Sequence, residues 1–330
     1  MVNASKRVGG GHIRRCLDLA DEITKNYPNQ IKIEFITWDL DVQFELLIER
    51  YKIQRIEENQ LLSFLDIVFS TEKHVFLVDV NSEHVQTVDF QVFLRNHGVK
   101  SIYFLANYDW SYNCDILINT SLLANEKTIK SASNTLCLLG PDYFIFRKSF
   151  RHLNNIKQQV KNKVFISFGN ADPHDYTLIF IHYFLEVKTD LEIVIIVGSA
   201  NSNLNEIREL GNKLPKNVDL VFDEDDLLPF MENSKFAMVS VGSVFYELGL
   251  LGIPTILFPS SEMENLVAKH LVKLGFAKMG IEYGETFKVE TIEAYLIEPI
   301  ELERKDLKAL LNPLGIEKIV QEFRLEESIC

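Results

Sequence analysis

Three short segments of this sequence combine glycine with polar side chains in patterns that can bind an anion or move a proton. The first is Gly9-Gly10-Gly11-His12, which is followed by an amphipathic stretch at 13–26. Glycine lets the backbone turn sharply and approach a ligand, and the N-terminus of the following helix would point at that ligand. His12 can act there as a general base, or it can cap the helix and orient a ligand. The spacing alone leaves both roles open.

The second segment is 166–173 (ISFGNADP), in which a buried strand ends in Gly-Asn and a helix follows. An aspartate before a proline is a favourable helix start. We expect Phe168, Gly169, Asn170 and Asp172 to contact a ligand here. A plain capped turn between a strand and a helix explains the same residues, and the segment alone does not decide between the two.

The third segment, 239–247 (VSVGSVFYE), is the most specific, with a strand, a Gly-Ser turn and then a helix. The N–H groups at Ser243 and Val244, just after Gly242, would be helix-start donors suited to a pyrophosphate. Glu247 lies one turn further on the same helix face, where its carboxylate can accept both hydroxyls of a ribose. A solvated Glu247 is the alternative, but the surrounding helix is apolar, so we favour the ligand role.

Asp79 ends a buried strand at 76–79, where it would face the ligand side of a sheet. It can be catalytic, as strand-end carboxylates often are, or it can cap a loop. The acidic run 223–226 lacks the spacing of a calcium loop and is expected to be a solvated turn. Arg14 stands where a dinucleotide fingerprint needs its third glycine. We therefore expect no metal and no resident cofactor.

Short apolar runs alternate with amphipathic stretches throughout the chain, which predicts α/β domains with doubly wound parallel sheets. The expected strands are 31–38, 75–80, 102–105, 116–118, 164–168, 193–197, 218–222, 236–241 and 255–259. The expected helices include 13–26, 88–97, 204–214, 243–251 and 264–274.

The length of 330 residues predicts two domains. The alternation weakens at 140–162, so we place the boundary near 150–160, giving domains 1–150 and 151–330 with the ligand site in the cleft between them. Residues 1–4 are short and polar for a first strand. We expect that strand to be shortened or missing, or the natural start to lie upstream.

Net charge, cysteine content and the length of the apolar stretches limit the partners and the cellular setting that we expect. The net charge is −13 and no basic stripe is present, which argues against nucleic acid as a partner. Four scattered cysteines favour a reduced, cytoplasmic protein. Apolar stretches are too short to span a bilayer, so no stable membrane insertion is expected. We expect a monomer or a weak dimer.

Taken together, the motifs resemble the nucleotide-sugar enzymes of the GT-B superfamily. The likeness is to the UDP-2,4-diacetamido-2,4,6-trideoxy-β-L-altropyranose hydrolases of pseudaminic acid synthesis and the related spore-coat polysaccharide proteins. The first family pattern, G-x-G-H-x-x-R-C-L-x-L-A, is matched by Gly9, Gly11, His12, Arg15, Cys16, Leu17, Leu19 and Ala20. The second family pattern, S-F-G-G-A-D-P, is matched at 167–173 with Asn170 in the place of the second glycine. Further matches are Cys114-Asp115, Leu139-Gly140-Pro141 with Tyr143, Gly242-Ser243 with Glu247, and Leu251-Gly252-Ile253-Pro254.

The resemblance implies two Rossmann-like domains and a hydrolase that releases UDP from the anomeric carbon with inversion, using water and no metal. His12, in the sugar-side domain, would activate or position the water. In the UDP-binding domain, 168–172 would lie near the nucleotide, 242–244 on the pyrophosphate and Glu247 on the ribose.

Three segments depart from the family pattern, all on its sugar side. Asp79-Val80-Asn81 replaces D-x-Y, segment 105–113 lacks the family's paired acids, Arg and His, and 261–264 lacks the Asn and Gln of A-x-N-Q. Two alternatives therefore stand beside the hydrolase: a GT-B glycosyltransferase using a UDP-sugar donor, and an inactive protein that binds a nucleotide sugar.

Overall fold

The computed structural model describes residues 1–5, 10–70, 73–80, 82–105, 107–153, 162–285, 289–297 and 307–325. The chain divides into two compact units: Met1–Ile145 with Asn312–Cys330, and Phe146–Leu311. Residues 312–330, predicted from the sequence as part of the second domain, belong to the first compact unit of the structure. The reason is packing, because Ile316, Ile319 and Val320 share a buried cluster with first-unit residues.

Unit 1 begins with α1 (Gly11–Asn26), whose buried face includes Ile13, Cys16, Leu19 and Ala20 at helical spacing. The other helical elements of this unit are α2 (Val42–Ile48), η1 (Glu58–Gln60), α3 (Leu61–Phe69), α4 (Glu83–Gln86), α5 (Val88–Asn96), η2 (Glu126–Thr128), η3 (Pro141–Tyr143) and α13 (Gly315–Glu322). The strands are β1 (Glu34–Thr37), β2 (Lys52–Arg55), β3 (Val75–Val78), β4 (Lys100–Phe104), β5 (Ser111–Tyr112), β6 (Ile116–Asn119), β7 (Lys130–Ser131) and β8 (Leu136–Leu139).

Parallel strands of unit 1 pair as β1-β2 and, in a second sheet, as β3-β4-β6-β8. Residues 1–5 run between these two sheets, because Val2 bridges to Asp79 beyond β3 and Ala4 bridges to Leu40 beyond β1, both in parallel. The backbone adds hydrogen bonds from Val2 N to Ile36 O (3.0 Å) and from Asp79 N to Met1 O (3.0 Å). Residues 1–5 thus join the two sheets through isolated parallel bridges and form no named strand of either sheet.

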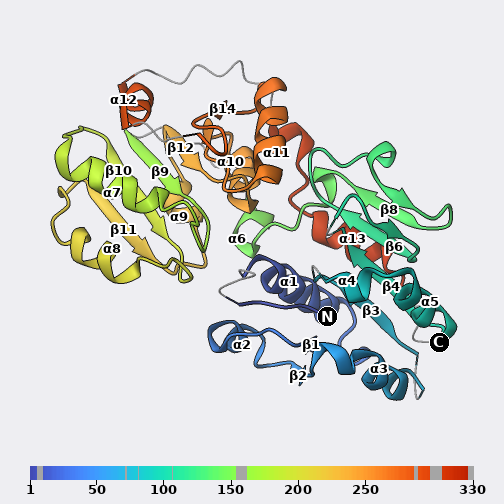
Figure 1. Cartoon of the computed structure of the whole chain (residues 1–330). Coiled ribbons are helices and arrows are strands. Elements are labelled where there is room, and N and C mark those ends of the chain that lie inside the picture. Colours follow the sequence, from blue (N-terminus) through green and yellow to red (C-terminus); the bar gives the residue numbers. More distant parts are fainter. Residues whose placement is uncertain are drawn as a thin grey trace. The chain divides into compact units, whose positions relative to one another are not determined.

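Unit 2 contains the helical elements α6 (Lys148–Arg151), α7 (Tyr176–Glu186), α8 (Leu204–Gly211), α9 (Leu228–Met231), α10 (Ser243–Leu251), α11 (Glu262–Lys273), α12 (Val289–Ile297) and η4 (Leu307–Leu310) (Figure 1). Its strands are β9 (Lys163–Ser167), β10 (Glu192–Val197), β11 (Val218–Phe222), β12 (Phe236–Val239), β13 (Thr255–Leu257) and β14 (Lys278–Met279). In the described part of this unit they form one parallel sheet in the order β11-β10-β9-β12-β13-β14.

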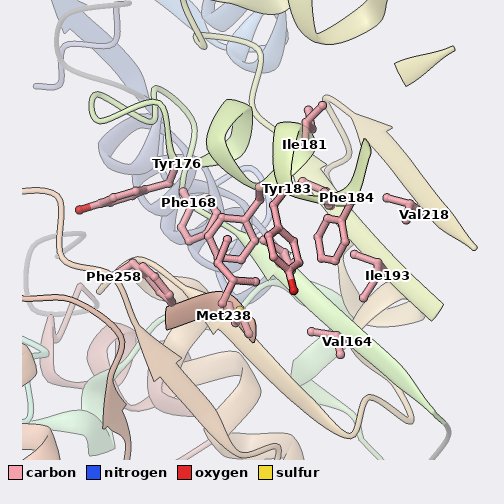
Figure 2. Close-up of a cluster of buried hydrophobic side chains, with 14 of the residues drawn as sticks. Val164, Phe168, Tyr176, Ile181, Tyr183, Phe184, Ile193, Val218, Met238 and Phe258 are labelled. Atoms are coloured by element: carbon pink, nitrogen blue, oxygen red, sulfur yellow. The ribbon is translucent and has the colours of Figure 1, made fainter. Parts of the chain in front are cut away.

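The core of unit 2 explains why its strands read as continuous apolar runs. In β10, five consecutive residues after Glu192 are buried, as expected for a parallel strand covered on both faces. Figure 2 shows part of this core, with Phe168, Tyr176 and Phe258 close together and Met238 beside them. The rings of Phe168 and Phe258 meet edge-on at a centroid distance of 5.4 Å. Aromatic pairs of this kind stabilise a core beyond the area that they bury.

Each strand expected from the sequence overlaps an observed strand, and each expected helix overlaps an observed helix. Several elements were not expected, including β2, β8, α3 and α13. In unit 2, β10 and β11 lie in succession on one side of β9, and β12, β13 and β14 lie in succession on its other side. The strand order therefore reverses between β9 and β12. In unit 1 the corresponding change lies between residues 1–5 and β3. Ligands of open α/β sheets bind at the carboxyl ends of strands at such switch points.

Candidate functional site

His12 and Asp79, which the sequence offered as two separate catalytic candidates, are in contact in the structure. His12 is the second residue of α1, and Asp79 follows β3 at the switch point of unit 1. His12 Nδ1 lies 2.7 Å from Asp79 Oδ1. The His12 side chain is 34% exposed, whereas that of Asp79 is 2% exposed. The pair therefore anchors an accessible imidazole to a buried carboxylate.

Arg15 completes this cluster, and its partner Asp79 lies 64 positions away in the sequence. Arg15 Nε donates to Asp79 Oδ2 at 2.5 Å, and Arg15 Nη2 donates to Asp79 Oδ1. The guanidinium carbon lies 4.2 Å from the ring centroid of Phe104, at the end of β4. Cys16 Sγ lies 3.4 Å from Asp79 Oδ2 and donates to it. His12, Arg15 and Cys16 thus converge from one helix on one carboxylate, because positions three and four residues apart share a helix face.

The charges in this cluster fix the state of Asp79. Burial by itself would raise the pKa of Asp79, but the charges and hydrogen bonds of Arg15 and His12 hold that pKa well below its usual range. Burial, together with the neighbouring Asp79 charge, raises the pKa of the Cys16 thiol. Asp79 is therefore an ionised acceptor, and Cys16 is a protonated donor rather than a nucleophile.

In unit 2, the loop after β9, which was predicted to contact a ligand, packs closely against the backbone at the end of β10. Gly169 has a φ of +84°, a conformation that favours glycine, and it is exposed. A Cβ on Gly198, at the end of β10, would come within 2.3 Å of the Asn170 carbonyl oxygen. Ser199 Oγ donates to Asn170 Oδ1 at 3.2 Å. The turn at Gly169 and Asn170 is therefore held against the neighbouring strand end, at the edge where the strands of the sheet have their carboxyl ends.

Two further residues predicted to bind the nucleotide have structural contacts of their own. Phe168 is 2% exposed and its side chain belongs to the core (Figure 2). Asp172 is equally buried, and it accepts from the backbone N–H groups of Tyr176 (3.1 Å) and Thr177 (2.7 Å). Both Asp172 oxygens are thus used at the start of α7, in the arrangement of the capped turn that the sequence left open. A nucleotide role for either side chain remains a prediction.

The third predicted segment lies across the switch point from this loop. Ser240 N donates to Ser167 O at 3.1 Å, which joins the end of β12 to the end of β9. Helix α10 then starts at Ser243 with Gly242 as its N-cap, which has no side chain with which to cap the helix. Ser243 is exposed, whereas the Val244 side chain is buried. The backbone amides at this helix start are donors of the kind that bind phosphate.

Glu247 is not the solvated helix residue of the alternative interpretation, because it is only 1% exposed. Its Oε1 lies 3.3 Å from Arg147 Nε. Arg147 Nη1 also donates to the Asp225 carbonyl at 3.2 Å, so it links α10 to the loop after β11. The predicted contact of Glu247 with a ribose stays a prediction, and a ribose there would meet Arg147 as well.

Glu264 is a residue that the sequence analysis noted only as a departure from the family. Its Oε2 accepts from Ser260 N at 2.8 Å and from Val241 N at 3.4 Å, which ties α11 to the loop before α10. Ser261 Oγ in turn accepts from Glu264 N at 3.2 Å. The S-x-x-E spacing of a capping box was the signal that could have indicated this position.

Gly9, Asn81, Ala106 and Cys330, which entered the sequence analysis, lie outside the described residues. Gly11 is the first residue of α1, and a Cβ there would meet nothing within 4 Å. Among the residues that the structure describes, no three His, Cys, Asp or Glu side chains gather as a metal site. No helix in the same part of the chain is long and apolar enough to cross a membrane.

Comparison with known proteins places the fold. No protein family model matches the chain. Uncharacterized protein MJ1062 of Methanocaldococcus jannaschii is 26% identical over 278 residues, which is 80% of this chain and 56% of that protein. The chain thus spans little more than half the length of this relative.

Solved structures similar to the chain cover nearly all of it. MurG of Acinetobacter baumannii has a TM-score of 0.59 at 11% identity, covering 95% of this chain and 96% of its own. The calicheamicin glycosyltransferase CalG4 has a TM-score of 0.57 at 13% identity, covering 96% and 95%. The UDP-GlcNAc 2-epimerase of M. jannaschii has a TM-score of 0.56 at 14% identity, covering 93% and 96%. The chain therefore has the GT-B fold of two Rossmann-like domains.

Proposed function

We propose that this protein is a GT-B enzyme that hydrolyses a UDP-linked amino-deoxy sugar at the anomeric carbon and releases UDP. The observation that carries the proposal is the 2.7 Å contact between the accessible His12 ring and the buried Asp79 carboxylate at the switch point of unit 1. A histidine oriented by a carboxylate is a frequent general base. The motif resemblance adds the expected setting, nonulosonic acid or surface polysaccharide synthesis in the cytoplasm.

In the proposed reaction, His12 Nε2 takes a proton from water while the water oxygen attacks the anomeric carbon. The bond from that carbon to the diphosphate oxygen breaks, and UDP leaves with the electron pair. The products are UDP and a sugar with a new hydroxyl group, inverted at the anomeric carbon. Asp79 accepts from Nδ1, which orients the ring and leaves Nε2 to act as the base.

The proposed UDP site belongs to unit 2. The amides at the start of α10 would donate to the diphosphate and stabilise charge on it as it departs. The turn at Gly169 and Asn170, in which Gly169 is exposed, would approach the nucleotide, and Glu247 would accept from the ribose hydroxyls. The likeness to an epimerase that is named for UDP-GlcNAc supports a UDP-sugar substrate.

A glycosyltransferase is the second candidate, supported by the likeness to CalG4 and by the departures from the hydrolase pattern on the sugar side. It shares the UDP-sugar and the base, but His12 would then deprotonate an acceptor hydroxyl or amine instead of water.

Release of UDP from a panel of UDP-sugars, measured with and without candidate acceptors, tests the proposal. Acceptor-free release of UDP, with free sugar formed in equal amount, supports hydrolysis. Release only with an acceptor supports the transferase. UDP binding without turnover of any donor would overturn both and leave a binding protein.

A further inference from the structure

Arg15 stands in a geometry that affects His12 as well as Asp79. Arg15 Nη2 lies 3.0 Å from His12 Nδ1, while both nitrogens also contact Asp79 Oδ1. The two side chains leave α1 three residues apart and meet the carboxylate from the same helix face. Stacking of the guanidinium on Phe104 holds it in this place.

The contact between His12 and Asp79 bears on which nitrogen of the His12 ring carries a proton. Two atoms 2.7 Å apart, His12 Nδ1 and Asp79 Oδ1, share one proton. Because Asp79 is ionised and can only accept, its short contact requires the proton on Nδ1. The 3.0 Å approach of Arg15 Nη2 to Nδ1 is then an approach of two donors, not a hydrogen bond. The second ring nitrogen, Nε2, then bears the lone pair whenever the ring is neutral.

A lone carboxylate beside an imidazole would favour the doubly protonated imidazolium, which cannot act as a base. Here Arg15 cancels the charge of Asp79. We propose that Arg15 is a positioning residue that keeps His12 as a neutral imidazole with Nε2 unprotonated. This inference rests on the proposed role of His12 as the base.

The ionisable groups that face this point are few in the described part of unit 1. They are His12, Arg15 and Cys16 of α1, Asp79 after β3, and the amino group of Met1, which interacts with Asp79 and Cys16. The Cys16 thiol is protonated, and burial lowers the pKa of the Met1 amino group. The net charge beside the His12 ring is therefore set by Arg15 and Asp79.

Nitrogen-15 NMR of the histidine rings in the whole chain tests the proposal, with His12 assigned by its loss in His12→Gln. At neutral pH, wild type and Arg15→Lys should show one protonated and one unprotonated ring nitrogen, whereas Arg15→Gln should shift toward two protonated nitrogens. An unchanged His12 pattern in Arg15→Gln would overturn the proposal. A merely structural role for Arg15 predicts that unchanged pattern.

Should Arg15→Gln not fold, the double variant Arg15→Gln/Asp79→Asn replaces it, because it removes both charges together. The proposal then predicts a neutral ring in the double variant and in Arg15→Lys, and two protonated nitrogens in either would contradict it.

UDP release gives a second readout. Arg15→Gln should lose about tenfold to a hundredfold in kcat, part of the range typical of general-base catalysis, and Arg15→Lys should recover most of it. Equal kcat for wild type and Arg15→Gln would overturn the proposal. A wild type that turns over no donor would refute the proposed function, while the NMR comparison would still decide the effect of Arg15 on the ring.

Discussion

Replacing Asp172 by alanine tests whether this side chain caps a helix or binds the nucleotide. The change removes the acceptor of two backbone N–H groups, those of Tyr176 and Thr177, whose residues are 6% and 1% exposed. Each buried N–H left without a partner costs about 1–3 kcal/mol. Burial raises the pKa of Asp172 despite these bonds, so removing the carboxylate also relieves a desolvation cost. We therefore expect a net loss of about 2 kcal/mol.

Thermal unfolding followed by circular dichroism measures this loss. For a unit of this size, 2 kcal/mol corresponds to a Tm about 4–8 °C lower. The exposed Asp219 on β11 provides the matched control, and Asp219→Ala should leave the Tm within about 1 °C, as is usual for surface substitutions. In the same Asp172→Ala protein, the Kd for UDP should stay near the wild-type value. An unchanged Tm together with a large rise in that Kd would refute the cap interpretation.

Three further results are expected. Ser243→Asp should place a negative charge at the start of α10 and weaken UDP binding about tenfold, as measured by titration calorimetry, while the Tm stays unchanged or rises. Gly198→Ala should force a Cβ against the Asn170 backbone, lowering stability by about 1–3 kcal/mol in urea unfolding and weakening UDP binding. Because the pKa of Asp79 is lowered by folding, its stabilising effect is complete above about pH 4 and is lost as the pH falls below that value. The unfolding free energy of wild type should therefore fall more steeply below about pH 4 than that of Arg15→Gln/Asp79→Asn.

Much of the fold could be predicted from the sequence, because strands buried on both faces read as apolar runs. β10 and β12 are examples, since all but the first residue of β10 and all of β12 are buried. β2 and β8 lack that signature, because half or more of the residues in each are not buried. The return of α13 to unit 1 depends on packing against residues some 200 positions earlier, such as Ile102 and Ile118, which no local pattern reveals.

Site residues could be predicted from the sequence where they stand at a helix start or a strand end. Contacts between residues far apart in the chain could not be predicted. His12 at a helix start and Asp79 at a strand end were both indicated by their place in the pattern. The pairing of Arg15 with Asp79 joins residues 64 positions apart, and nothing local indicates it. In the same way, the apolar helix around Glu247 pointed to a buried role, but its contact with Arg147, 100 positions earlier, required the structure.

Acceptor-free release of UDP by wild type and by His12→Gln is the most direct test of the central claim. The variant should bind UDP as wild type does, because the proposed UDP contacts lie in unit 2. Its rate of UDP release should fall on the order of 10²- to 10⁴-fold, the usual share of a general base. Equal rates in the two proteins, with UDP binding intact, would contradict the role of His12 and the mechanism built on it.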